Sequence, residues 1–315
     1  MKISVLDAGT LGKDINLLSF PELSQAKIYV KTNYGETADR IADSDVIILN
    51  KVKIGNKEIE NASNLKLICI TATGFDNVDL EACREKGIAV CNVKGYSTDS
   101  VAQTTVASVL SLVMNLGFYD RFVKSGEYTK SGLHNRLEPA FYELSGKTWG
   151  IVGYGDIGKK VADVARAFGC NILAYSRTEK KDVENVDIDT LCEKSDIITL
   201  HLPLTEKTKH VIGKKQLDKM KRSVILYNAA RGAVTDEEAV AEAVKNGNIG
   251  AFGTDVYSIE PLRSDNPIYT IKDMDNVVLT PHLAWGAYEA RVRCVKEVIE
   301  NIKSFEAGRQ RNRVI

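Results

Sequence analysis

Short apolar runs alternate with helical stretches along almost the whole chain, and this alternation restricts the fold more than any other feature. The runs before residue 97 are 3–6, 28–30, 46–49, 67–70 and 88–90, and those after Gly146 are 149–152, 172–175, 197–200, 224–227, 249–252 and 277–279. Strands that alternate with helices form parallel sheets, because each return to the same edge needs a crossover. The sequence therefore predicts an α/β fold with two doubly wound parallel sheets.

The chain contains 315 residues, which is long enough for two hydrophobic cores. Between the two series of strands lies the polar segment 97–100, typical of a helix start, followed by an apolar helix over 101–116. A last amphipathic helix, over 288–307, comes after the second series is complete and is expected to pack on the first. The predicted domains are therefore 1–98 plus 285–315, which is discontinuous, and 99–284.

Charge and composition exclude several classes of partner. The 42 basic residues balance the 42 acidic ones, so nucleic acid and membrane surfaces are not expected partners. The segment 101–116 is interrupted by polar residues and is shorter than the roughly 20 apolar residues that span a bilayer. The N-terminus begins directly with a strand pattern, and the 6 cysteines form no C-x-x-C pair. These features predict a cytoplasmic protein with reduced thiols and no metal site.

A Gly-x-Gly-x-x-Gly turn lies between the strand 149–152 and an amphipathic helix that runs to Phe168. In this setting Gly153 allows the tight turn, Gly155 allows close approach of a pyrophosphate, and Gly158 allows the helix to pack on the strand. Glycines at this spacing also occur in ordinary turns, but the flanking strand and helix favour a dinucleotide site. The helix start supplies free N–H groups for phosphate.

The end of the next strand bears on the choice of coenzyme. An acidic residue about 20 residues beyond the glycines receives the ribose hydroxyls of NAD. Here the sequence has Ser176 and Arg177 instead. A guanidinium pairs well with a 2′-phosphate, which favours NADP over NAD, although Arg177 is also compatible with a solvent-exposed loop.

Three polar residues follow strand ends in the second series, where ligands of open parallel sheets bind. They are Arg231, Glu260 and His282. Histidine suits proton transfer to a developing alkoxide, a carboxylate can orient the imidazole, and an arginine can hold a 2-oxo acid by two oxygens. Each residue alone is more often structural or solvated, but their occurrence together beside a dinucleotide turn predicts hydride transfer to a carbonyl.

The chain resembles the D-isomer-specific 2-hydroxyacid dehydrogenases over nearly its whole length. The motifs that carry this resemblance are Gly74–Asp79, Gly153–Gly158, His201–Thr205, Asn228–Gly232, Asp255–Pro261 and Thr280–His282. The resemblance implies a Rossmann domain inserted in a flavodoxin-like substrate domain, with Arg231, Glu260 and His282 as the catalytic set. It also implies that Asp255 holds the nicotinamide carboxamide and that other residues line the coenzyme cleft. These are Thr73, Asp156, Ile157 and Ala230.

The same resemblance points to a substrate class and to a dimer. The loop with Thr73, Gly74 and Phe75 would offer N–H groups to the substrate carboxylate. The segments 95–103 and 282–286 look most like glycerate dehydrogenases, also called hydroxypyruvate reductases, and Trp285 would narrow the pocket or simply fill a domain junction. Alternatives are a D-lactate-type or broad 2-oxo acid reductase, a corepressor-like dinucleotide sensor, and a formate or phosphite dehydrogenase. A homodimer packed through 101–116 is expected, and His201 is not expected to act as a base.

Overall fold

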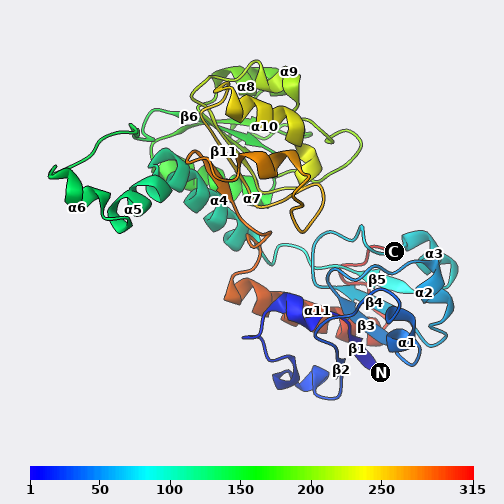
Figure 1. The fold of residues 1–315 in the computed structure, drawn as a ribbon. Helices are drawn as coiled ribbons and strands as arrows, with labels where there is room; N and C mark the ends of the chain where they lie inside the picture. Colours follow the sequence, from blue (N-terminus) through cyan, green and yellow to red (C-terminus); the bar gives the residue numbers. More distant parts are fainter. The chain divides into compact units, whose positions relative to one another are not determined.

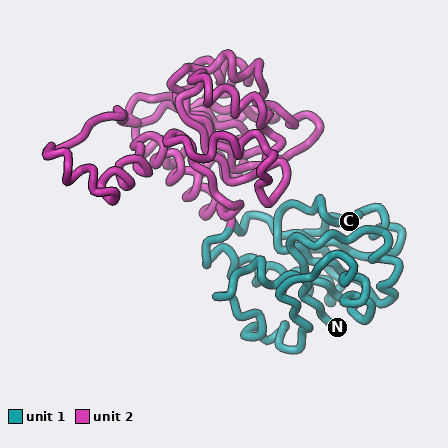
Figure 2. Tube along the Cα trace, in the orientation of Figure 1, with its two compact units in different colours: residues 1–97, 286–315 teal, residues 98–285 magenta.

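The computed structural model describes residues 1–315, which form two compact units (Figures 1 and 2). Unit 1 contains Met1–Ser97 and Gly286–Ile315, and unit 2 contains Thr98–Trp285. Each unit is built on one sheet whose strands all run parallel, so the predicted α/β class with two parallel sheets is confirmed.

Unit 1 has a five-stranded sheet in the order β2-β1-β3-β4-β5. Its strands are β1 (Ile3–Val5), β2 (Lys27–Ile28), β3 (Val46–Leu49), β4 (Leu67–Ile70) and β5 (Ala89–Cys91). Its α-helices are α1 (Thr37–Ile41), α2 (Asn56–Glu60), α3 (Leu80–Glu85) and α11 (Tyr288–Glu306). Every residue of β3 and β4 is buried, because helices cover both faces of a parallel sheet. The terminal helix α11 packs against β4.

Unit 2 has a seven-stranded sheet in the order β12-β11-β10-β9-β6-β7-β8. The strands are β6 (Thr148–Val152), β7 (Asn171–Tyr175), β8 (Glu184–Asn185), β9 (Ile197–Leu200), β10 (Ile225–Asn228), β11 (Ala251–Thr254) and β12 (Val277–Leu279). The α-helices are α4 (Thr98–Val113), α5 (Leu116–Lys124), α6 (Glu127–Ser131), α7 (Asp156–Ala167), α8 (Ile188–Lys194), α9 (Lys214–Leu217) and α10 (Glu237–Lys245). The sequence did not predict β8, which has no apolar run.

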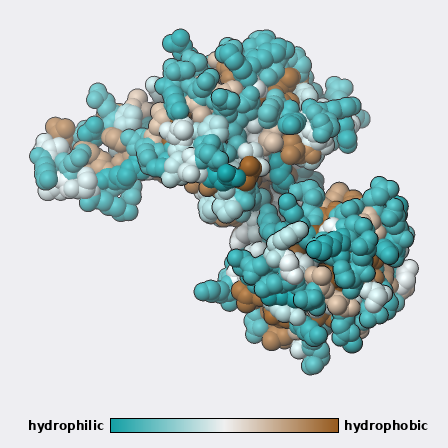
Figure 3. All heavy atoms as spheres, turned by 45° about the vertical axis from the view of Figure 1, so that its right-hand side comes forward, coloured by the Kyte–Doolittle hydropathy of each residue, from teal (hydrophilic) through white to brown (hydrophobic).

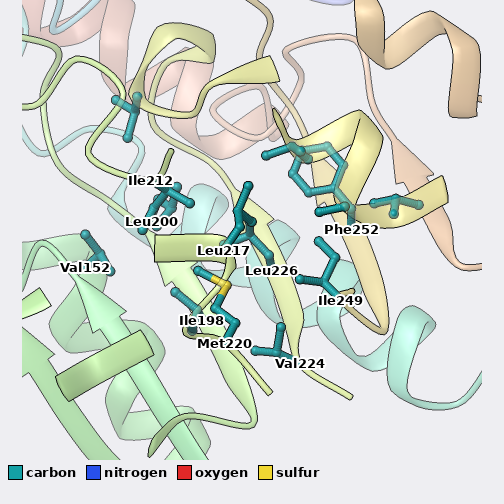
Figure 4. Close-up of a cluster of buried hydrophobic side chains, with 14 of the residues drawn as sticks. Val152, Ile198, Leu200, Ile212, Leu217, Met220, Val224, Leu226, Ile249 and Phe252 are labelled. Carbon is teal, nitrogen blue, oxygen red and sulfur yellow. The ribbon is translucent and has the colours of Figure 1, made fainter. Parts of the chain in front are cut away.

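The core of unit 2 consists of aliphatic side chains from the central strands and the helices that cover them (Figure 4). Leu200 on β9, Leu226 on β10 and Phe252 on β11 are almost completely buried there. This packing fixes the strands, so that the loops at their carboxyl ends start from rigid positions.

The order of strands in unit 2 reverses between β6 and β9. From β6 the chain proceeds to β7 and β8 on one side, and from β9 it proceeds to β10, β11 and β12 on the other. Loops leaving two such neighbours diverge, which opens a crevice at the carboxyl ends of the strands where open α/β sheets bind ligands. The glycine-rich turn follows β6, and the three predicted site residues follow β10, β11 and β12.

The predicted helix over 101–116 differs from the structure at its end. The helix α4 stops at Val113, and α5 begins at Leu116 after Asn115 takes a left-handed φ of 51°. Within unit 2, α4 packs against α7 and against β10, β11 and β12, which covers its apolar faces. Packing inside unit 2 thus accounts for much of the apolar surface of this helix, and the dimer contact expected through 101–116 stays a prediction. No single helix is both long and apolar enough to cross a membrane; only the pair α4 and α5, bent by 64°, passes on length and composition.

Candidate active site

The side chains of His282 and Glu260 form a direct pair. Glu260 lies in the loop after β11 and His282 in the loop after β12, 2.7 Å apart between Nδ1 and Oε2. The two side chains are partly exposed, 22% for His282 and 30% for Glu260. A carboxylate on Nδ1 sets the tautomer of the ring and leaves Nε2 as the nitrogen that can exchange a proton with a ligand.

The Glu260 carboxylate is oriented by its own loop. Its Oε1 accepts a hydrogen bond of 3.2 Å from the backbone nitrogen of Tyr257, so that Oε2 faces His282. The hydroxyl of Tyr257 in turn donates to the carbonyl oxygen of Thr280 at 3.1 Å. Tyr257 therefore joins the loop of Glu260 to the loop of His282.

Asp255 holds the segment on both sides of His282. This residue is 1% exposed, and its Oδ1 accepts hydrogen bonds from Thr280 Oγ1 at 2.6 Å and from Leu283 N at 2.9 Å. Its Oδ2 accepts from Ala284 N at 2.9 Å. His282 has a left-handed φ of 52°, an unfavourable conformation for a residue with a side chain, and these bonds stabilise it. Sequence reasoning missed this function of Asp255, for which the only signal was an acid at a strand end.

Arg231 begins a tight turn after β10. The buried Asn228 side chain accepts from Ala230 N at 3.0 Å and donates to the carbonyl oxygen of Arg231 at 2.9 Å. The next residue is Gly232, where a Cβ would lie 2.0 Å from the carbonyl carbon of Tyr257. The backbone after Arg231 is thus in direct contact with the loop of Glu260. All three predicted catalytic residues lie on loops of unit 2 that contact one another.

The glycine-rich turn has the shape that a pyrophosphate requires. Gly153 has a φ of 101°, and a Cβ there would lie 2.8 Å from the carbonyl carbon of His201. A Cβ on Gly158 would lie 2.2 Å from the carbonyl oxygen of Gly153, whereas one on Gly155 would meet nothing within 4 Å. The side of Gly155 is therefore open to a ligand, and α7 starts at the next residue, Asp156. This geometry fits a dinucleotide with its phosphates at the helix start.

The segment after β7 carries the residues predicted to select the coenzyme. Ser176 Oγ donates to the carbonyl oxygen of Thr178 at 2.7 Å, and Arg177 is exposed. Further along, Asp182 lies 3.2 Å from the ammonium group of Lys159 on α7, and this hydrogen bond lowers the pKa of the Asp182 carboxyl. The segment is thereby tied to the helix that follows the glycine-rich turn.

The loop predicted to bind the substrate carboxylate belongs to unit 1 and follows β4. Thr73 Oγ1 donates to the carbonyl oxygen of Val93 at 2.9 Å, and the Asn92 side chain donates to the carbonyl oxygen of Thr73 at 2.8 Å. Both carbonyl contacts fix the backbone of this loop. Phe75 is 37% exposed and Gly74 is half-buried.

His201 follows β9 at the same edge of the sheet. Both of its ring nitrogens are buried without a hydrogen-bond partner, and burial lowers the pKa of His201 to about 3. Burial therefore favours the neutral form of the ring in the folded protein. The six cysteines are free and buried, and burial raises the pKa of Cys192 to about 12. No group of three or more His, Cys, Asp or Glu side chains is arranged to hold a metal ion.

Together, the doubly wound sheet, the glycine-rich turn and the His282–Glu260 pair define a dinucleotide-dependent oxidoreductase. Residues 106–284 match the family described as D-isomer specific 2-hydroxyacid dehydrogenase, NAD binding domain. The chain is 36% identical over 312 residues to a glycerate dehydrogenase of Methylorubrum extorquens, covering 99% of this chain and 98% of that protein. The chain belongs to the D-isomer specific 2-hydroxyacid dehydrogenase family and is an NAD(P)-dependent 2-oxo acid reductase.

Solved structures agree with this assignment over the full chain. D-lactate dehydrogenase from Aquifex aeolicus, complexed with NAD and lactic acid, superposes with a TM-score of 0.86 at 29% identity, covering 98% of this chain and 96% of that one. An acyclic imino acid reductase in complex with NADPH and D-Arg gives a TM-score of 0.85 at 30% identity, with 100% of both chains covered. Both NAD and NADP are therefore used on this fold.

Proposed function

We propose that the protein reduces hydroxypyruvate to D-glycerate and glyoxylate to glycolate. The observation that supports this most directly is the His282–Glu260 pair, held beside the turn of Arg231 within one unit. The similarity to a glycerate dehydrogenase over 99% of the chain favours small 2-oxo acids. Trp285 lies three residues after His282, where a large ring would restrict the size of the substrate.

Each residue has a role set by its chemistry. The bound coenzyme supplies the hydride or accepts it. The guanidinium of Arg231 binds the carboxylate and the carbonyl oxygen of the substrate, and the N–H groups of Thr73 and Gly74 add to the carboxylate site. His282 Nε2 delivers the proton to the oxygen on which negative charge develops, while Glu260 on Nδ1 stabilises the imidazolium before transfer.

The residues that would hold the coenzyme are those of the glycine-rich turn and the loops beside it. They are Gly153, Gly155, Asp156, Ile157, Gly158, Ser176, Arg177, Thr73, Ala230 and Asp255. NADP is the preferred coenzyme in this proposal, because Arg177 is exposed after β7 and no acid stands there to receive a ribose 2′-hydroxyl.

The test of this function is a kinetic comparison of substrates with each coenzyme. Reduction of hydroxypyruvate, glyoxylate, pyruvate and bulkier 2-oxo acids is followed at the absorbance of the reduced nicotinamide. The proposal expects the highest kcat/KM for hydroxypyruvate or glyoxylate with NADPH. The highest kcat/KM for pyruvate would instead indicate a D-lactate-type enzyme, and no turnover of any 2-oxo acid would favour a dinucleotide-sensing module.

We also infer a homodimer, in which the arm that follows α4 adds to the contact expected through 101–116. The arm 116–143, which contains α5 and α6, projects from the rest of unit 2 and shows hydrophobic residues at its surface (Figures 1 and 3). Its large exposed apolar side chains are Leu116, Val123, Leu133, Leu137, Phe141 and Tyr142. A second copy would cover such a surface. Light scattering at micromolar concentration should give twice the mass of the chain, and a monomer would refute the inference.

A further inference from the structure

We propose that Glu237, in the first turn of α10, is a positioning residue that controls proton transfer at His282 through Glu260. This inference rests on the proposed function, because it gives Glu237 a role only if the His282–Glu260 pair performs the proton transfer. Glu237 itself contacts neither residue of the pair. It acts on the loop between β11 and β12 that carries Glu260.

One carboxylate holds this loop at two places. Glu237 Oε1 accepts a hydrogen bond of 2.8 Å from Ser258 N, and Oε2 accepts from Ser258 Oγ and, at 2.7 Å, from the Asn266 side chain. Asn266 is 8% exposed and also accepts from Ile268 N at 2.8 Å, at the start of the next helical turn. The loop is therefore closed by Glu237 on either side of Glu260.

The contact at Ser258 reaches Glu260 through one residue, Tyr257. The nitrogen that Glu237 holds belongs to the peptide between Tyr257 and Ser258, and Tyr257 N donates to Glu260 Oε1 at 3.2 Å. On its other side the same peptide rests on Gly232, where a Cβ would lie 2.1 Å from Ser258 N. The peptide is thus fixed from two directions. Because it is joined at the Tyr257 Cα to the peptide whose N–H binds Glu260, a shift of one peptide displaces the other.

Removal of the Glu237 carboxylate leaves three donors without this acceptor. The two donors of Ser258 lie at the surface, where water can replace it, whereas Asn266 is largely buried, and a buried donor without an acceptor is costly. The peptide is then free to rotate away from Gly232, which shifts Tyr257 N and with it the Oε2 atom that faces His282. A displacement of about 1 Å at a catalytic group lowers the rate by up to about 10²-fold. The start of α7, where the coenzyme phosphates would bind, is not part of this loop, so coenzyme binding should not change.

The experiment is a double-mutant cycle between positions 237 and 260. The kcat for hydroxypyruvate reduction is measured in the wild type, Glu237→Ala, Glu260→Gln and the double variant, with KM for the coenzyme as a second readout. Glu238→Ala is the matched control, because Glu238 carries the same charge in the same helical turn but is exposed. We expect Glu237→Ala to lower kcat about tenfold with an unchanged KM for the coenzyme, and Glu237→Gln, which keeps one acceptor oxygen, to recover most of this loss.

In the Glu260→Gln background, Glu237→Ala should change kcat less than about twofold, because its effect passes through the missing carboxylate. Equal losses in both backgrounds, or a kcat for Glu237→Ala within twofold of the control, would overturn the inference. If Glu237→Ala does not fold, kcat is measured for Glu237→Asp instead. The shorter side chain of aspartate cannot reach Ser258 and Asn266 together. A wild type without turnover, or a Glu260→Gln variant with full turnover, would instead refute the proposed function.

Discussion

The buried carboxylate of Asp255 holds the backbone nitrogen of Leu283 at 2.9 Å, one residue beyond His282. The same group binds Ala284 N and Thr280 Oγ1, so the imidazole projects from a short segment that is fixed at both ends. The geometry of His282 is therefore determined by a residue of the neighbouring strand end as much as by its own loop.

Asp255→Asn should lower both activity and stability. The amide nitrogen of asparagine would face either the Ala284 N–H or the Leu283 N–H, donor against donor, and one backbone group would lose its acceptor. We expect kcat to fall about 10- to 100-fold and the free energy of unfolding to fall by about 1–3 kcal/mol. Steady-state kinetics and urea denaturation measure the two effects, with the exposed Asp273→Asn as control. Unchanged kcat would exclude Asp255 from the positioning of His282.

His282→Ala should lower kcat for reduction by about 10²- to 10⁴-fold, the usual contribution of a positioned acid or base. The variant should melt at the temperature of the wild type, since the side chain is partly exposed and leaves no buried cavity. His134→Ala, at an exposed position of the arm, serves as control. Turnover like that of the wild type would refute the assignment of His282.

Arg231→Lys should weaken substrate capture as well as turnover. An ammonium group is a point charge and cannot bind the carboxylate and the carbonyl oxygen of a 2-oxo acid together. We expect KM for the 2-oxo acid to rise about tenfold, which corresponds to about 1.4 kcal/mol, and kcat to fall. The exposed Arg222→Lys should leave both constants unchanged. If KM and kcat were also unchanged in Arg231→Lys, Arg231 would not be part of the substrate site.

Arg177→Ala should discriminate between the coenzymes. If the guanidinium binds a 2′-phosphate, KM for NADPH should rise about tenfold while KM for NADH changes less than about twofold. The comparison variant is Lys245→Ala, at the far end of α10. Equal increases for NADPH and NADH would contradict a phosphate contact.

His201 should make the protein sensitive to acid. Burial lowers the pKa of His201 to about 3, whereas an unfolded histidine titrates near about 6.5. The unfolded state therefore binds the proton first, and stability falls as the pH drops from about 6.5 toward 3, by up to about 1.4 kcal/mol per pH unit. Urea denaturation at several pH values should show a smaller loss for His201→Asn, which has no group to protonate. Parallel curves for the two proteins would contradict the prediction.

The strands, and the positions of His282 and Glu260 after two of them, could be predicted from sequence because each leaves a local pattern. A buried parallel strand such as β3 is a continuous apolar run, and Glu260 and His282 lie in the loops after β11 and β12. By contrast, β8 consists of Glu184 and Asn185 and pairs with β7 through its backbone alone, so no side-chain pattern marks it.

The contacts that orient the site could not be predicted in this way. Asp255 and Glu237 act on backbone N–H groups, which every residue except proline has, so the partner cannot be read from residue types. The break at Asn115 is similarly hidden, since the left-handed conformation of one asparagine interrupts a stretch whose apolar spacing continues. Only the packed structure shows where such bonds are made.

The absence of a side chain at Gly232 has a consequence for attempts to redesign this enzyme. Because two active-site loops meet there backbone to backbone, their lengths and paths cannot be varied independently, and insertions near Tyr257 would displace the arginine turn as well. Ile259 and Leu283, which are next to Glu260 and His282 in the sequence, are 56% and 46% exposed. Substitution of these exposed side chains leaves that backbone contact unchanged, whereas a change of loop length does not.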